Sequence, residues 1–157
     1  GSRGTIETRY AEAAEAGKIL GISARHNLQL ADGFFTHDKE SLLKLVVQIR
    51  RFQPEIVLAN AIQDRHPDHG RAAKFISDAC FLAGLLKIET SWKGETQTAW
   101  RPKAVYHYIQ DRYIKPDFVV DVTNFAERKI EAILAYKTQF FDPNSSEPKT
   151  PLSKLKE

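Results

Sequence analysis

Sulfur-containing residues are almost absent from this chain of 157 residues, which has one cysteine and no methionine. A single cysteine forms no disulfide within the chain, which argues against a small disulfide-stabilised secreted scaffold. Cys80 lies in the apolar stretch SDACFLAGLL, so we predict a reduced thiol in the core. These features favour a cytoplasmic protein.

Long apolar runs and a strong excess of one charge are also missing. No stretch reaches the roughly 18 apolar residues that can cross a membrane, and the chain does not open with the charged-then-apolar pattern of a secretory leader. The 23 Lys and Arg residues outnumber the 20 Asp and Glu residues only slightly, and they are spread along the chain without blocks. We therefore expect neither a membrane nor a nucleic acid as a partner.

The remaining composition is that of an ordinary globular domain, with 42% hydrophobic and 27% charged residues. The length predicts a single domain over residues 1–157. Hydrophobic periodicity predicts helices at residues 5–21, 37–54, 68–86 and 124–140, and strands at residues 55–60, 103–109 and 117–122. Because helices and strands alternate, we predict an α/β fold, namely a Rossmann-like, mostly parallel sheet with helices on both faces.

Local signals refine these elements. Thr5 is the expected N-cap of the first helix, Pro54 the stop of the second, and Thr123 or Asn124 the cap of the last. The apolar run EIVLAN predicts a strand buried on both faces. A turn is expected at residues 32–33 and a polar loop at residues 141–153. The predicted core positions on the second and third helices are Leu42, Leu43, Val46, Val47, Ile49, Phe75, Ile76, Ala79, Phe81, Leu82 and Leu86.

The stretch QDRHPDHGRAA, residues 63–73, concentrates titratable side chains directly after the predicted strand at residues 55–60. In open α/β sheets, ligands bind beyond the carboxyl ends of strands. His66 and His69 share one face if the helix is continuous, or point to different sides of a pocket if Pro67 opens a turn. Imidazole is a common zinc ligand, but catalytic zinc usually takes three protein ligands. A solvated polar loop therefore remains an equal alternative.

The other histidines carry weaker signals. His26 and His37 lie in polar surroundings and are predicted to be surface residues. His107 alternates with tyrosines on a predicted strand, which favours a half-buried, hydrogen-bonded histidine over a site residue. Arg9 lies on an early helical turn, where it either clamps an anionic substrate or pairs with Glu12.

Several stretches together resemble the PIG-L/LmbE family of zinc-dependent N-acetylglucosaminide deacetylases. They are GSRGTIETR, PEIVLAN followed by QDRHPDHG, KPDFVVDVT and AYKTQFFDPNSSEPKTPLS. More narrowly, the chain resembles the branch that deacetylates N-acetylglucosaminyl malate in bacillithiol biosynthesis. The resemblance implies one Zn²⁺ or another divalent ion per chain, a small amino-sugar conjugate as substrate, and a homo-oligomer, either a trimer or a hexamer.

The resemblance also implies roles for individual residues. His69 matches a zinc ligand, and His66 matches the histidine that stabilises the oxyanion or protonates the leaving amine. Asp68 matches the carboxylate that orients and tunes His66. Arg9 matches an arginine that contacts the anionic group of the substrate. Asp64 and Arg65 belong to the same motif and are interpreted as shaping the pocket only.

The chain departs from the family pattern in two places. It has no A-H-P-D-D-x-E stretch, which in the family completes the zinc site and supplies the general base, and it lacks the tyrosine-bearing C-terminal segment. We therefore expect a fragment that is inactive alone and comes from an active parent protein. Two alternatives stay open, namely a non-catalytic sugar- or metal-binding remnant of the fold and a two-metal phosphoesterase.

Overall fold

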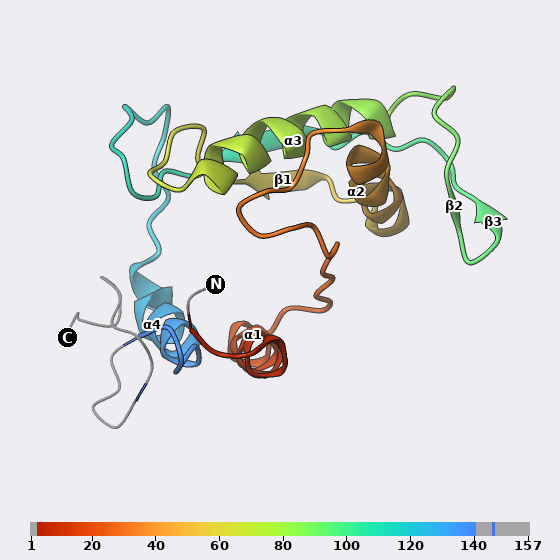
Figure 1. The fold of residues 1–157 in the computed structure, drawn as a ribbon. Helices are drawn as coiled ribbons and strands as arrows, with labels where there is room; N and C mark the ends of the chain where they lie inside the picture. The colour runs from red at the N-terminus through yellow and green to blue at the C-terminus, as the bar shows by residue number, and fades with distance from the viewer. Residues whose placement is uncertain (1–2, 141–145, 147–157) are drawn as a thin grey trace. The chain divides into compact units, whose positions relative to one another are not determined.

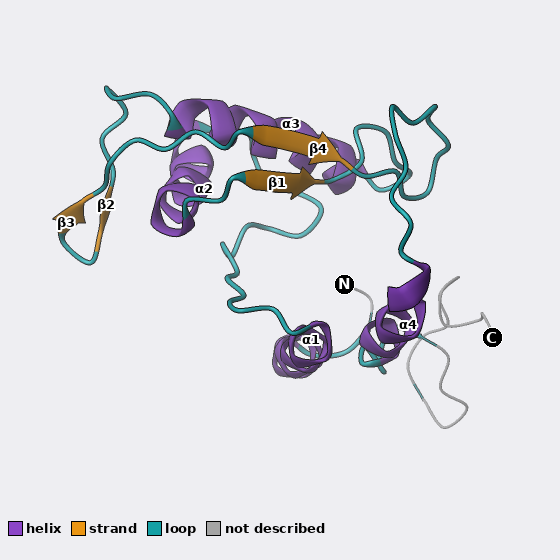
Figure 2. Cartoon of the chain, turned by 180° about the vertical axis from the view of Figure 1, so that it is seen from behind, coloured by secondary structure: helices purple, strands orange, loops and turns teal. Residues whose placement is uncertain are grey.

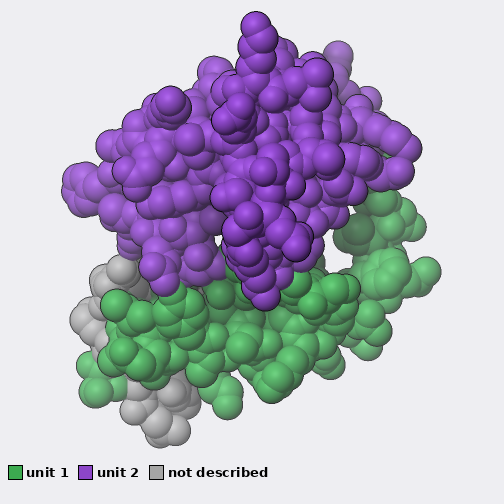
Figure 3. Space-filling view, turned by 90° about the vertical axis from the view of Figure 1, so that its right-hand side faces the viewer, with its two compact units in different colours: residues 1–26, 119–157 green, residues 27–118 purple. Residues whose placement is uncertain are grey.

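The structure is a computed structural model, and it describes residues 3–140 and residue 146. The chain is divided into two compact units, one formed by residues 1–26 with 119–157 and the other by residues 27–118, as coloured in Figure 3. The single domain expected over residues 1–157 stays a prediction. Apart from residue 146, the predicted loop at residues 141–153 lies outside the described residues.

The unit of residues 27–118 is built around a parallel pair of strands. Strand β1 (Ile56–Ala59) pairs with β4 (Ala104–His107) from Ile56 opposite Ala104 to Ala59 opposite His107. Helix α3 (Pro67–Ala83) lies in the connection between them, and helix α2 (Lys39–Phe52) precedes β1. Figures 1 and 2 show this strand–helix–strand arrangement from opposite sides. Parallel strands joined by a helical crossover confirm the predicted α/β class.

The core of this unit lies where α2 and α3 pack together and against the strands. Its buried members are Val46, Ile49, Ala79, Cys80 and Ala83, with Val57 and Val105 packed against them. The expected burial of Phe75 is also confirmed, whereas Phe81 and Leu86 are 56% and 87% exposed, so these two core predictions are wrong. Asp38 caps α2, and Gln53, with a positive φ of 47°, ends it directly before Pro54.

The strand predicted to be buried on both faces is buried on one. Successive side chains of a strand point to opposite faces. Val57 packs against the core and Ala59 is buried, whereas Ile56 and Leu58 are 59% and 72% exposed. Within the unit of residues 27–118, helix α3 packs against this pair of strands.

Two further differences concern short strands. Strands β2 (Ser91–Trp92) and β3 (Glu95–Thr96) form an antiparallel hairpin that we did not predict, and Lys93 and Gly94 turn it with φ of 52° and 87°. The strand predicted at residues 117–122 is wrong, because the structure gives this segment no regular pairing. An apolar run becomes a strand only where a neighbouring strand accepts its hydrogen bonds.

The other unit pairs two helices. Helix α1 (Ile6–Leu20) begins at Thr5, whose side chain accepts the backbone N–H of Thr8, as predicted, and ends at Gly21 with a left-handed φ of 68°. A short turn, η1 (Thr123–Phe125), leads into α4 (Ala126–Leu134), which packs against α1. The last helix therefore ends earlier than the predicted residue 140. No helix within the described ranges is both long and apolar enough to span a membrane.

Candidate functional site

The predicted site lies between the carboxyl end of β1 and the start of α3, in the unit of residues 27–118. His66 is the N-cap of α3 and Pro67 its first residue, where the missing N–H of proline has no helical acceptor to lose. The sequence signal therefore placed the motif correctly at a strand-to-helix junction. Three side chains of the motif meet there, namely Asp64, His66 and His69.

Asp64 is the most buried of these groups, with a side chain that is 1% exposed. Its Oδ1 accepts the backbone N–H of His66 at 3.0 Å and lies 3.1 Å from Nδ1 of His69. The hydrogen bond from His66 lowers the pKa of Asp64 below its ordinary value, and the neighbouring His69 side chain lowers it further, against the effect of burial. The carboxylate is thus held in its ionised form.

The two imidazole rings lie beside one another, with centroids 5.0 Å apart and planes inclined by 30°. The rings share one face, as in the first of the two predicted alternatives, although His66 caps the helix in an extended conformation and the helix is not continuous through it. Nδ1 of His66 accepts the backbone N–H of Asp68 at 3.2 Å. Because that nitrogen is an acceptor, the neutral ring of His66 carries its proton on Nε2 and can donate from there.

The Asp68 carboxylate makes its contacts with other partners. Its Oδ2 accepts the backbone N–H of Gly33 at 2.6 Å, and its Oδ1 accepts Nη1 of Arg71 at 2.7 Å. Arg71 also reaches the carbonyl of Gly33 and lies over the ring of Phe35. The carboxylate of Asp68 therefore ties the loop of residues 31–35 to α3. Its role in orienting and tuning the imidazole of His66 stays a prediction.

The segment after β4 adds residues that sequence reasoning did not select. Nε of Arg65 lies 3.3 Å from Oδ1 of Asp111. The pKa of Tyr108 is raised by burial and by the negative charge of Asp64. Both positions follow the end of the strand that neighbours β1, so the parallel pairing itself is the signal that could have identified them.

The remaining histidines of this unit have structural contacts. Nδ1 of His107 lies 2.8 Å from the carbonyl oxygen of Asn60, so it carries a proton, and Nε2 lies 3.1 Å from the hydroxyl of Ser77. This is the half-buried, hydrogen-bonded histidine that we predicted. His37 pairs with Asp78, with Nε2 and Oδ2 separated by 3.0 Å.

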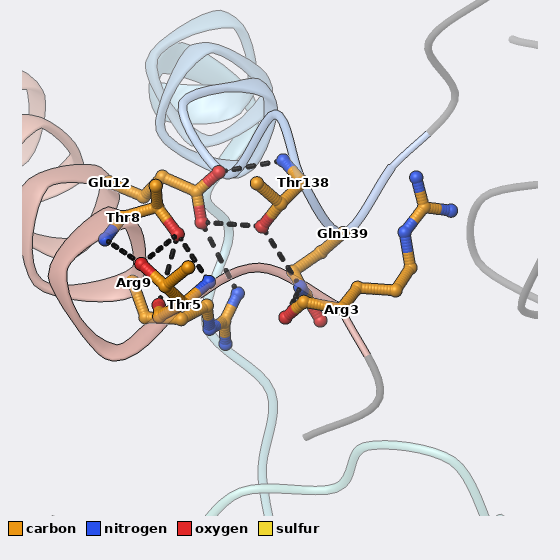
Figure 4. A network of polar contacts seen from close by, with 7 residues as sticks. All are labelled: Arg3, Thr5, Thr8, Arg9, Glu12, Thr138 and Gln139. Atoms are coloured by element: carbon orange, nitrogen blue, oxygen red, sulfur yellow. Dashed lines mark hydrogen bonds and ion pairs between the residues drawn. The ribbon is translucent and has the colours of Figure 1, made fainter. Parts of the chain in front are cut away.

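Arg9 belongs to the other unit, where it takes part in the polar network of Figure 4. Its side chain is 42% exposed, lies 3.4 Å from Glu12 and stands over the ring of Tyr136. Glu12 in turn accepts the backbone N–H and the hydroxyl of Thr138 at 2.6 and 2.9 Å. The predicted pairing of Arg9 with Glu12 is confirmed, and its contact with substrate stays a prediction.

The described residues do not build a metal site by themselves. Among them, no group of three or more His, Cys, Asp or Glu side chains is arranged to hold an ion. The ring of His69, which is 31% exposed with Nδ1 buried, fits a single ligand position through Nε2. A zinc centre would therefore need further ligands in addition to His69.

Comparison with known proteins matches residues 1–80 to the family model described as PIG-L, GlcNAc-PI de-N-acetylase. The chain is 28% identical over 135 residues to a diacetylchitobiose deacetylase of Thermococcus kodakarensis and 29% identical over 130 residues to a 4-oxalmesaconate hydratase of Pseudomonas putida. These matches cover 84% and 81% of this chain. The chain spans about half of each relative, 49% in both cases.

Solved structures give the same picture of the fold. The conserved protein TT1542 from Thermus thermophilus matches with a TM-score of 0.80 and 37% identity, over 89% of this chain and 61% of that one. An N,N'-diacetylchitobiose deacetylase from Pyrococcus horikoshii, solved with an inhibitor, matches with a TM-score of 0.72 at 24% identity, over 87% of this chain and 51% of that one. The latter likeness supports the α/β fold alone.

Proposed function

Because the chain belongs to the PIG-L family, we propose that the whole protein hydrolyses the N-acetyl group of an amino-sugar conjugate. The observation that carries this proposal is the stacked pair of His66 and His69, with the buried Asp64 beside it, at the carboxyl end of β1. The relationship to a diacetylchitobiose deacetylase supports the same reaction type.

His66 is suited to act on the oxygen of the scissile amide. Its Nε2–H can donate a hydrogen bond to the oxyanion that forms when water attacks the acetyl carbonyl. The contact between Nδ1 and the Asp68 backbone fixes the ring for this task. A bound zinc ion would supply activated water, and we propose His69 as one of its ligands in the whole protein.

We propose N-acetylglucosaminyl malate as the substrate, with Arg9 binding a malate carboxylate, in a cytoplasmic homo-oligomer. The guanidinium of Arg9 is partly exposed and retains donors for a bidentate contact. The decisive experiment measures acetate release from this substrate by the complete protein, with and without a chelator. Release that stops on chelation supports the zinc hydrolase, and full activity without metal contradicts it.

A hydratase is the second candidate, because the 4-oxalmesaconate hydratase is as similar to this chain as the deacetylase is. Both reactions add water, so His66 and His69 fit either one. Incubation of the complete protein with 4-oxalmesaconate distinguishes them: hydration without acetate release from amino sugars favours this candidate. Phosphate release from phosphate esters, or sugar binding without turnover, would favour the phosphoesterase or the non-catalytic remnant instead.

A further inference from the structure

Two buried polar atoms at the site make no hydrogen bond of ordinary geometry within the described part of the chain. They are Nδ1 of His69 and Oδ2 of Asp64. Buried polar atoms are almost always paired in folded proteins, so each such atom calls for an explanation. The two residues face one another, because Oδ1 of Asp64 lies 3.1 Å from that same Nδ1.

We propose that Asp64 is the positioning residue of the site, which holds the proton of His69 on Nδ1 and so leaves a lone pair on Nε2. An ionised carboxylate only accepts hydrogen bonds, so the ring nitrogen that faces it must be a donor. The role of Asp64 thus goes beyond the pocket shaping expected from the sequence. This inference rests on the proposed function for its purpose, since a ring with a free Nε2 lone pair is what a metal ligand needs.

The surroundings of Asp64 explain why this carboxylate and not another has the role. Asp64 is anchored from its own loop, because the backbone N–H of His66 donates to Oδ1 and orients the group toward the rings. The carboxylate of Asp68, which is nearer to His69 in sequence, is occupied by Gly33 and Arg71. The separation of 3.1 Å between Nδ1 of His69 and Oδ1 of Asp64 is within hydrogen-bond range, although the N–H is not aligned with the oxygen.

The two stacked rings are then in opposite neutral forms. Asp64 places the proton of His69 on Nδ1, whereas the Asp68 backbone N–H places that of His66 on Nε2. At their Nε2 atoms, one ring offers an electron pair and the other offers a proton. A pair of this kind suits the proposed reaction. The lone pair of His69 would bind the metal ion, and the N–H of His66 would donate to the oxyanion.

The test reads the position of the proton directly. In the ¹⁵N-labelled 157-residue chain at about pH 8, above the ordinary histidine pKa of roughly 6.5, two-bond ¹H–¹⁵N correlations report which ring nitrogen is protonated. We expect Nδ1–H in His69. His107, whose Nδ1 faces the Asn60 carbonyl, is an internal reference for the same form. A His69 ring protonated on Nε2, or on both nitrogens, overturns the proposal without any variant.

Variants then assign the effect to Asp64. Asp64→Ala should move the His69 proton predominantly to Nε2, the form that a free imidazole side chain prefers, and leave His107 unchanged. Asp64→Asn keeps an acceptor oxygen and should give a smaller shift. Asp78→Asn is the matched control, because it alters an Asp–His contact of 3.0 Å at His37. An unchanged His69 ring in Asp64→Ala, or an equal change in Asp78→Asn, overturns the proposal.

The spectra separate this inference from the proposed function. They are recorded without metal or substrate, so a wrong tautomer contradicts the role of Asp64 and leaves acetate release by the complete protein unaffected. Conversely, absent acetate release contradicts the deacetylase and leaves the tautomer result standing. If Asp64→Ala does not fold, which its amide spectrum shows, then Asp64→Asn and the unaltered chain carry the test.

Discussion

Charged groups that are nearly removed from solvent lie at both ends of helix α3. The hydrogen bonds of these groups differ between the two ends. At the C-terminal end, Arg50 of α2 is 4% exposed and donates to the carbonyls of Ala83, Leu85 and Ile88 and to the hydroxyl of Thr90. These carbonyls lie at or just beyond the end of the helix, where backbone oxygens lack helical partners and a positive charge is favourable.

At the N-terminal end, the groups are only partly satisfied. Asp64 and His69 each keep a buried atom without an ordinary hydrogen bond, and two imidazole rings stack within 5.0 Å of each other. The comparison teaches that burial of charge serves structure where every donor is paired. Where pairing is incomplete, as at Asp64 and His69, the groups retain the capacity to bind something else.

The largest effect is expected at the N-terminal end and on activity. His66→Ala should lower kcat of the complete protein about 10²–10³-fold, or roughly 3–4 kcal/mol in the barrier, because one oxyanion donor is lost. His66→Asn should lose as much rate and keep helix stability, since asparagine is a good N-cap. Acetate release measures the first quantity and urea unfolding the second.

His37→Ala is the control for that loss, because His37 pairs with Asp78 away from the motif and should leave kcat unchanged. If His66→Asn keeps full activity, the imidazole takes no part in the reaction. The N-terminal end of α3 would then be structural, like the C-terminal end.

The second effect is expected at the C-terminal end and on stability. Arg50→Met should lower the free energy of unfolding by about 3 kcal/mol, because buried carbonyls lose a charged donor. Arg51→Met is the control, since the adjacent Arg51 stands over the rings of Trp92 and Phe52 and its loss should cost under about 1 kcal/mol. Denaturant unfolding measures both, and equal losses would mean that the polar cap of α3 contributes nothing specific.

The sequence predicted the N-terminal end of α3 to within one residue, at 68 against Pro67, but its C-terminal end at 86 against Ala83. The apolar periodicity predicted the helix, and the position of the motif after a strand predicted the strand-to-helix junction, because these are local signals. The contact of Asp68 with Gly33 joins residues 35 positions apart, and no spacing rule contains it. The contacts of Arg50 likewise depend on how α2 packs on α3, and the run at residues 117–122 has no neighbouring strand among the described residues.

A third, smaller effect should appear at high pH through Cys80, which lies in the buried core near the C-terminal end of α3. Burial raises the pKa of this thiol from 9.0 to about 11. The unfolded chain therefore releases the proton first, so the stabilisation is present below about pH 9 and is lost as the pH rises toward 11. The loss should be roughly 2 kcal/mol.

The free energy of unfolding of the chain and of Cys80→Ala, measured between pH 8 and 11, isolates this contribution. Lysines and tyrosines titrate in both proteins, so their effect cancels in the difference. The variant should be less stable near neutral pH and should lose less stability as the pH rises. Parallel curves for the two proteins would show that the thiol is as accessible in the folded state as in the unfolded one.

The smallest effect concerns Asp68, and it decides between two roles for one carboxylate. If Asp68 serves mainly to join α3 to Gly33 through Arg71, then Asp68→Asn should lower the free energy of unfolding by about 1 kcal/mol. The losses caused by Asp68→Asn and Arg71→Met should not add, because the two side chains share one contact. A double-mutant cycle by urea unfolding measures this coupling. If the two losses add, and Asp68→Asn instead shifts the pH–rate profile of the complete protein, the carboxylate acts on His66 as the family resemblance implies. The ring and the carboxylate would then have to move together when substrate binds.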